Sequence, residues 1–113
     1  MRLAAAVAGD INQTRTRALD DLVDVASSEV EIVAHIWKGD LDPAELDCDL
    51  TDSDTGTITI DFGDEYGWLA VAATAGVWLL VYEVTFGDGD QYTVPAIWPD
   101  EIRVSDYPEP VVP

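Results

Sequence analysis

"VWLLVYEVTFGDGDQYTVP", residues 77–95, predicts a β-hairpin. In its first half every second residue is large and apolar, a period that places one face of a strand in a protein core. The Gly-Asp-Gly-Asp at 87–90 supplies the turn, because glycine accepts positive φ and Asp-Gly favours tight hairpin turns. Pro95 ends the returning strand, since proline has no N–H for the ladder. The inward residues of the first strand are Trp78, Leu80, Tyr82, Val84 and Phe86.

The hairpin continues the most apolar run of the chain, "LAVAATAGVWLLVY" at 69–82. This run does not predict a membrane span, because a spanning helix needs about 20 apolar residues and Gly76 interrupts this shorter one. Both faces of the strand are apolar here, whereas a sandwich strand normally has one polar face. We therefore expect the outward Leu79 and Val81 to be covered by the N-terminal arm, by the alanine-rich segment before Gly76, or by another subunit.

Shorter stretches with the same alternation fill most of the remaining chain. Residues 29–37, 56–63 and 101–106 predict strands. A further short strand is expected near Leu46 to Leu50, and a short helical turn within 64–75. Six or seven short strands separated by turn residues favour an antiparallel β-sandwich.

The segments near the two ends of the sequence are less regular. Residues 14–25 fit either a strand followed by a turn or one to two helical turns. A length of 113 residues predicts one domain. We expect an N-terminal arm at 1–12, the β-sandwich at 13–105 and a Pro-rich tail of polyproline character at 106–113.

Acidic residues dominate the charge of the chain. There are 23 aspartates and glutamates against 5 lysines and arginines, a formal net charge of -18. Such a surface repels phosphates and anionic lipids, so neither nucleic acid nor a membrane is an expected partner. Abundant aspartate with a single lysine, Lys38, favours adaptation to molar salt, in which a Debye length of about 3 Å screens the self-repulsion. The alternative is an ordinary acidic protein.

The positive charge is concentrated near the N-terminus. Residues 1–19 carry three arginines and one aspartate, whereas the remaining chain carries two basic and 22 acidic side chains. A basic arm on an acidic body attracts a neighbouring acidic subunit, although strand arginines can also extend into solvent. We predict subunit contacts through this segment and through the outward apolar positions, at Met1, Arg2, Leu3, Arg15, Arg17, Leu79 and Val81.

Side chains that could carry chemistry form no catalytic motif. His35 lies on the polar face of a predicted strand beside surface glutamates, without a nucleophile at a recognisable spacing. Cys48 lies between two aspartates, which disfavour a thiolate. We therefore predict that the chain is not an enzyme and has no cofactor.

Two further groups of residues have alternative interpretations. The aspartates between 47 and 54 could hold calcium or sodium, but their spacing does not fit an EF-hand, so a solvated acidic turn is preferred and no metal is predicted. The tryptophans could form a sugar-binding platform if two or three were exposed in a row, but core packing or subunit contact is the more common use. These residues are Asp47, Asp49, Asp52 and Asp54, and Trp37, Trp68, Trp78 and Trp98.

In order and spacing, the predicted strands resemble the immunoglobulin-like N-terminal domain family of phage baseplate upper proteins and related small virion proteins of tailed viruses. The resemblance lies in "VDVASSEVEIVAHIW" at 23–37, "TAGVWLLVYEVTFGDGDQYTVP" at 74–95, "IWPDEIRV" at 97–104 and, more loosely, "AGDINQT" at 8–14. The chain departs from the family pattern at Ser27-Ser28, where a glycine usually follows a threonine. It also has additional N-terminal residues, and no receptor-binding domain is expected after it.

The resemblance implies an immunoglobulin-like β-sandwich of about seven short strands that acts as a non-enzymatic assembly module. Its expected place is the virion of a tailed virus, here one with a halophilic host. Its expected partners are other capsid, neck or tail subunits, in many copies of a symmetric assembly. The alternative function is a carbohydrate-binding or adhesive surface module, which predicts at least two exposed tryptophans in a row.

Overall fold

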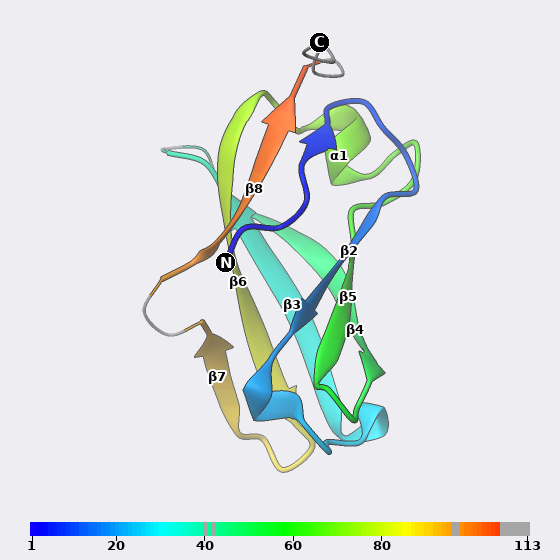
Figure 1. The fold of residues 1–113 in the computed structure, drawn as a ribbon, viewed down its shortest axis with the longest axis vertical. Helices are drawn as coiled ribbons and strands as arrows, with labels where there is room; N and C mark the ends of the chain where they lie inside the picture. Colours follow the sequence, from blue (N-terminus) through cyan, green and yellow to red (C-terminus); the bar gives the residue numbers. More distant parts are fainter. Residues whose placement is uncertain (40, 42, 96–97, 107–113) are drawn as a thin grey trace, which may run out of the picture.

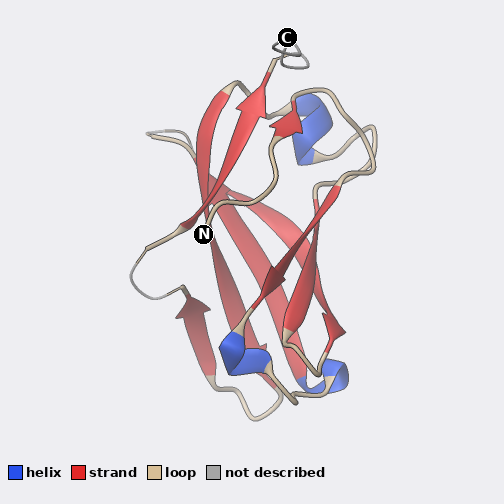
Figure 2. Cartoon of the chain, viewed as in Figure 1, coloured by secondary structure: helices blue, strands red, loops and turns tan. Residues whose placement is uncertain are grey.

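The computed structural model describes residues 1–39, 41, 43–95 and 98–106, and its fold is all-β, as predicted (Figure 2). Beyond Asp106, the predicted Pro-rich tail at 106–113 lies outside the described residues. The helical elements are η1 (Asp20–Leu22), η2 (Ser27–Glu29) and α1 (Trp68–Val71). The strands of the described chain are β1 (Ala6–Val7), β2 (Thr14–Ala18), β3 (Val30–Trp37), β4 (Ala44–Asp52), β5 (Thr57–Asp61), β6 (Gly76–Phe86), β7 (Gln91–Val94) and β8 (Asp100–Ser105).

The strands form one continuous sheet that curls into a half-barrel (Figure 1). Their order is β1-β8-β6-β3-β4-β5-β2, and β7 lies beside the second half of β6. The two halves of the curled sheet face each other across the core, so a single sheet provides sandwich-like layers. The described strand pairs are antiparallel except for β1 and β8, which run parallel.

β6 is the central strand of the fold. It pairs with β3 along the full length of β3, and on its other side it pairs with β8 and then with β7. The turn at 87–90 joins β6 to β7, which confirms the predicted hairpin. The strands predicted at 29–37, 56–63 and 101–106 are also confirmed, with ends that differ by no more than two residues.

Two stretches that the sequence left open also form strands. β4 is longer than the strand expected near 46–50, because its buried apolar residues alternate with exposed acidic ones over most of its length. Asp47 and Asp49 are therefore outward strand residues, and the expectation that they belong to an acidic turn is wrong. The turn begins only after Asp52. Residues 14–25 form the strand β2 followed by η1.

Short helical elements close both ends of the half-barrel (Figure 1). At one end lies α1, the helical turn predicted within 64–75, which buries Leu69. Beside it Trp68 packs edge-on against Trp78, with ring centroids 4.9 Å apart. At the other end η1 buries Leu22 completely. The apolar core between these plugs is continuous, so the half-barrel is a filled structure and not a pore.

The first eight residues belong to the wall of the half-barrel. They lie along β8, where the Leu3 N–H donates to the Glu101 carbonyl at 2.7 Å and the Ala8 N–H to the Ser105 carbonyl at 2.7 Å. The side chains of Leu3 and Ala6 are buried in the core. Most of the segment predicted as an arm at 1–12 therefore contributes to the fold itself.

Candidate functional site

The outer face of the sheet over β3 and β6 carries a strip of apolar side chains. Outward residues of neighbouring strands lie side by side: Leu79 is flanked by Trp37 on β3 and by Glu101 on β8. Val77 is 51% exposed, and the other members are half-buried. This apolar strip consists of Val33, Trp37, Val77, Leu79 and Val81.

Two of the three covers expected for Leu79 and Val81 lie elsewhere. The N-terminal segment runs along β8 at the edge of the sheet, and it does not cross β6. The alanine-rich segment includes α1, which buries Leu69 at one end of the core. In the described part of the chain the side chains of Leu79 and Val81 are half-buried.

The charges around the apolar strip differ in sign between its two ends. Beside Val77, the exposed Arg2 and Arg103 line a hollow of about 360 Å³ together with Leu3, Ala5 and Glu101. Towards the other end of β6 and across β3 and β4, the outward charges are acidic. The outer face is therefore basic at one end and acidic at the other. The acidic residues are Glu31, Glu45, Asp47, Asp49 and Glu83.

The other three cationic side chains of the described chain lie away from this hollow. Lys38 donates to the Thr74 hydroxyl and to the Ala75 carbonyl, each at 2.7 Å. Arg15 and Arg17 extend from β2 across a seam, where the two ends of the sheet approach each other. Arg2 and Arg103 thus provide the positive charge of the outer face.

No backbone ladder joins the described parts of β2 to those of β1 or β8. Arginine side chains bridge this seam instead. Arg15 donates through Nε to the Ala4 carbonyl at 2.8 Å and through Nη2 to the Ala5 carbonyl at 2.6 Å. It also donates to the Thr14 carbonyl on its own strand at 2.7 Å. These bonds satisfy edge carbonyls that could otherwise pair with another chain.

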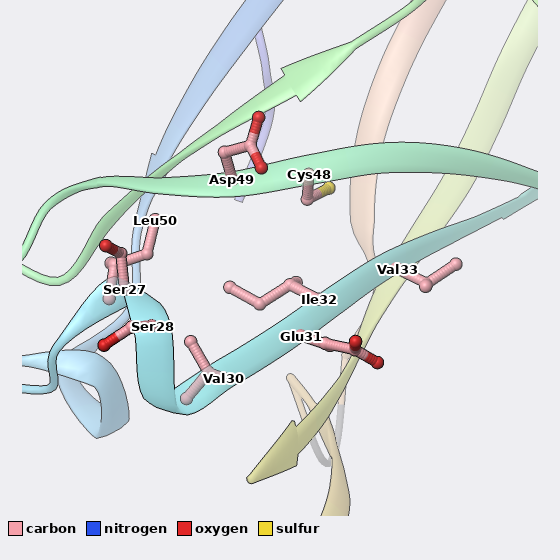
Figure 3. Close-up of a pocket in the computed structure, with 9 residues that line it drawn as sticks. All are labelled: Ser27, Ser28, Val30, Glu31, Ile32, Val33, Cys48, Asp49 and Leu50. Atoms are coloured by element: carbon pink, nitrogen blue, oxygen red, sulfur yellow. The ribbon is translucent and has the colours of Figure 1, made fainter. Parts of the chain in front are cut away.

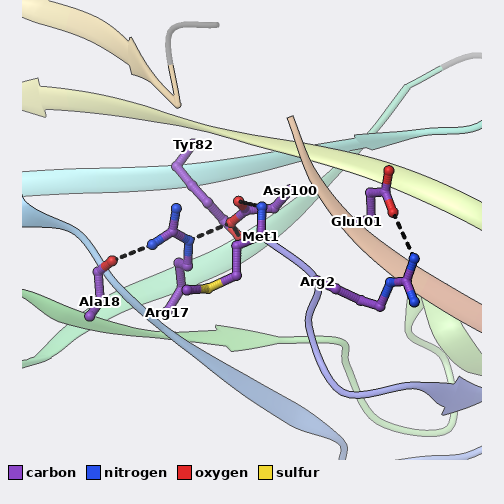
Figure 4. Close-up of polar contacts among 7 residues, drawn as sticks. All are labelled: Met1, Arg2, Arg17, Ala18, Tyr82, Asp100 and Glu101. Carbon is purple, nitrogen blue, oxygen red and sulfur yellow. Dashed lines mark hydrogen bonds and ion pairs between the residues drawn. The ribbon is translucent and has the colours of Figure 1, made fainter. Parts of the chain in front are cut away.

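Asp100 is a fully buried carboxylate at the same seam (Figure 4). Its Oδ2 accepts hydrogen bonds from Arg17 Nε and from the Tyr82 hydroxyl, both at 2.7 Å, and its Oδ1 lies 3.4 Å from the Met1 amino group. Burial, followed by the hydrogen bond to Asp100, raises the pKa of Tyr82 well above its ordinary value. Since a buried charge is tolerated only when it is paired and hydrogen-bonded, the network holds the seam closed.

The predicted contact residues therefore separate into two places. Met1, Leu3, Arg15 and Arg17 lie at the seam or in the core, whereas Arg2 lies at the basic hollow. Leu79 and Val81 lie on the apolar strip.

Sequence reasoning missed Asp100 as the partner of Arg17. A signal was present, because the alternation in "TRTRA" at 14–18 places both arginines on one face of a strand. By the same alternation, Asp100 shares the inward face of β8 with Ile102. An acidic residue in such a position needs a buried cation.

A second hollow opens where β3 and β4 diverge beyond the pair formed by Ile32 and Cys48 (Figure 3). Its volume is about 560 Å³. Val30 and Ile32 project toward the gap, whereas the Glu31 carboxylate points away from it. The Asp49 carboxylate also points away from it, so the two acidic lining residues do not converge as the polar groups of a small-molecule site do.

Cys48 and His35 lie on opposite faces of the sheet, Cys48 in the core and His35 on the outer face. Burial raises the pKa of Cys48 to about 12, so its thiol stays protonated at neutral pH. The Nε2 of His35 lies 3.6 Å from the Glu83 carboxylate on the outer face. Within the described ranges, no three side chains of His, Cys, Asp or Glu are grouped so that they could hold a metal ion.

The described tryptophans do not form an exposed row. Trp78 is buried, Trp37 and Trp68 are half-buried, and Trp98 is 78% exposed. The packing of Trp68 against Phe62 and Trp78 shows that two of these rings serve the core.

Comparison with known proteins finds neither a matching family model nor a matching curated protein. In the part of the chain that the structure describes, no helix is long and apolar enough to cross a membrane. The protein is thus a small all-β half-barrel whose seam is closed by side chains. Its outer face has an apolar strip with basic residues at one end and acidic residues at the other.

Proposed function

We propose that this chain is a non-enzymatic assembly module, a structural protein of a tailed virus particle that contacts other virion subunits through its outer face. The observation that carries the proposal is the apolar strip. Val77, Leu79 and Val81 lie side by side on the solvent face of a central strand. Contiguous apolar side chains on an exposed face indicate an interaction site.

The rigidity of the fold supports a role as a building block. The core is continuous, both ends of the half-barrel are plugged, and the seam is held by buried polar contacts. Such a body can present the outer face of its sheet without rearranging, which lowers the entropic cost of association. The resemblance of its sequence segments at 23–37, 74–95 and 97–104 to tailed-virus virion domains, and its acidity, which suits a halophilic host, support the same role.

Quantitative proteomics of purified particles tests the proposal. Virus particles from the lineage that encodes the chain are banded on a density gradient at molar salt and compared with the unbanded lysate. The chain should co-purify in a constant ratio to the major capsid protein across the gradient. Its absence from the particle band, under conditions that detect the minor tail proteins, would contradict the proposal.

A further inference from the structure

The outer face has a charge pattern that suits a second copy of the same chain. We propose that two copies associate through their outer faces, about a two-fold axis that lies in the interface and crosses β6. The proposal rests on the assembly role proposed above and names the partner of the same surface. Its geometry follows from the direction of β6, from the charges beside it and from the salt environment.

β6 sets the direction of the outer face. At one end Val77 is paired with Arg103 on β8, beside the hollow that Arg2 also lines, and Glu101 in this hollow offsets one of the two positive charges. Three outward positions further along, Glu83 is paired with Val33, and Val33 is in turn paired with Asp47 on β4. The apolar strip therefore runs from a basic end to an acidic end.

A two-fold axis across β6 makes this pattern self-complementary. The rotation reverses the direction of β6 in the second copy and keeps the β8 side of one copy over the β8 side of the other. Arg103 of each copy therefore reaches the level of Glu83 on β6 of the other copy. The middle of the apolar strip, at Leu79 and Val81, then packs against itself. An axis along β6 would instead place acidic end on acidic end. An interface of this kind is isologous and closes at two copies, and charge complementarity fixes its orientation.

The net charge determines when such a dimer forms. Two bodies of -18 each repel one another in dilute buffer. At molar salt the Debye length falls to about 3 Å, which screens the general repulsion between the exposed charges, whereas the apolar contact and the charge pairs enclosed in the interface persist. Dimerisation should therefore increase with salt, whereas an interface held by ion pairs alone would weaken.

Two of the three N-terminal arginines do not contribute to this contact. Arg15 and Arg17 are used within the chain, on the Ala4 and Ala5 carbonyls and on Asp100. Withdrawing them to contact another subunit would leave Asp100 buried without its guanidinium partner, which is costly. The docking surface is consequently the outer face and not the seam.

Sedimentation velocity on the full chain tests the inference. At about 0.1 mM protein, an interface with a Kd of about 10 µM is mostly dimeric. We expect monomer in dilute buffer and dimer in about 2 M KCl. Val77→Ser should weaken dimerisation at least about tenfold, because a symmetric interface loses the side chain twice. Val71→Ser is the matched control, since Val71 is 68% exposed on α1, away from the outer face.

A charge-reversal pair tests the orientation. Arg103→Glu at the basic end and Glu83→Arg at the acidic end should each weaken self-association, and an equimolar mixture of the two variants should restore a heterodimer. Circular dichroism confirms that each variant is folded. A chain that is monomeric at every KCl concentration, or a mixture that associates no better than either variant alone, overturns the inference. If the chain is monomeric but still enters particles, the proposed dimer is refuted and the assembly role stands. If the chain dimerises but is absent from particles, the assembly role is refuted and the dimer stands.

Discussion

Replacing Arg17 by alanine tests whether the seam holds the half-barrel together. The Arg17 guanidinium is 17% exposed and donates to the fully buried Asp100 at 2.7 Å. The substitution leaves Asp100 with the Tyr82 hydroxyl at 2.7 Å and the Met1 amino group at 3.4 Å. Removing one partner of a buried ion pair costs about 3–5 kcal/mol, because the other charge stays desolvated.

The corresponding change in melting temperature is large for a chain of 113 residues. About 4 °C is lost per kcal/mol at this size, so Arg17→Ala should lower the Tm by about 12–20 °C. Thermal unfolding followed by circular dichroism at constant KCl measures it. Arg2→Ala is the control, since Arg2 is 81% exposed and lies 3.8 Å from the half-exposed Glu101. An exposed pair of this kind contributes less than about 1 kcal/mol.

A double variant separates the buried charge from the lost packing of the arginine. Asp100→Asn in the Arg17→Ala background removes the unpaired charge, so it should recover a measurable part of the lost stability. Equal small shifts for Arg17→Ala and Arg2→Ala would refute the reasoning about the seam. Additive effects would refute it as well: in that case Asp100→Asn would lower the stability of the Arg17→Ala variant as much as it lowers that of the unsubstituted chain.

Three further predictions concern stability. Gly56→Ala should lower the free energy of unfolding in urea by clearly more than the strain of the left-handed backbone alone, which is about 1–2 kcal/mol. The added Cβ would collide with the Leu19 carbonyl. Gly39→Ala is the control, because Gly39 also has a positive φ but no described atom lies within 4 Å of an added Cβ. Stability should fall from pH 9 toward pH 12, because unfolded Cys48 ionises near 9.0 and folded Cys48 only near 12. Cys48→Ala should flatten that decline by up to about 1.4 kcal/mol per pH unit, and an unchanged urea profile would contradict the burial of the thiol. The Tm should rise steeply from dilute buffer to molar KCl if the net charge of -18 reflects adaptation to salt, whereas a flat response would contradict that adaptation.

Local pattern was sufficient to predict the strands around β6. The alternation in 77–86 and the turn at 87–90 depend on neighbours in the sequence, and the structure has the hairpin they predict. The apolar outward side of the same strand also indicated the outer face in advance. Local pattern does not predict how the sheet curls. This curl joins the expected layers into one half-barrel.

The seam depends on a contact between residues far apart in the sequence. Arg17 and Asp100 are 83 positions apart. The strand alternation around each residue indicates which face its charge occupies, but it does not say which residue of another strand is its partner. The charge split between the N-terminal residues and the rest of the chain was real, but an arginine attracted to an acidic body can satisfy that attraction within one chain. The sequence alone does not distinguish an intramolecular partner from a neighbouring subunit, because both present the same acidic surface.

The outer face is the central claim, and incorporation into particles tests it most directly. Particles are produced with a tagged copy of the chain carrying either Val77→Ser or Val71→Ser, and the tagged copy is quantified against the major capsid protein. Both variants remove one exposed valine, from β6 and from α1 respectively. The account predicts that Val71→Ser enters particles like the unsubstituted chain, whereas incorporation of Val77→Ser falls at least about tenfold. Equal incorporation of the two variants would contradict it.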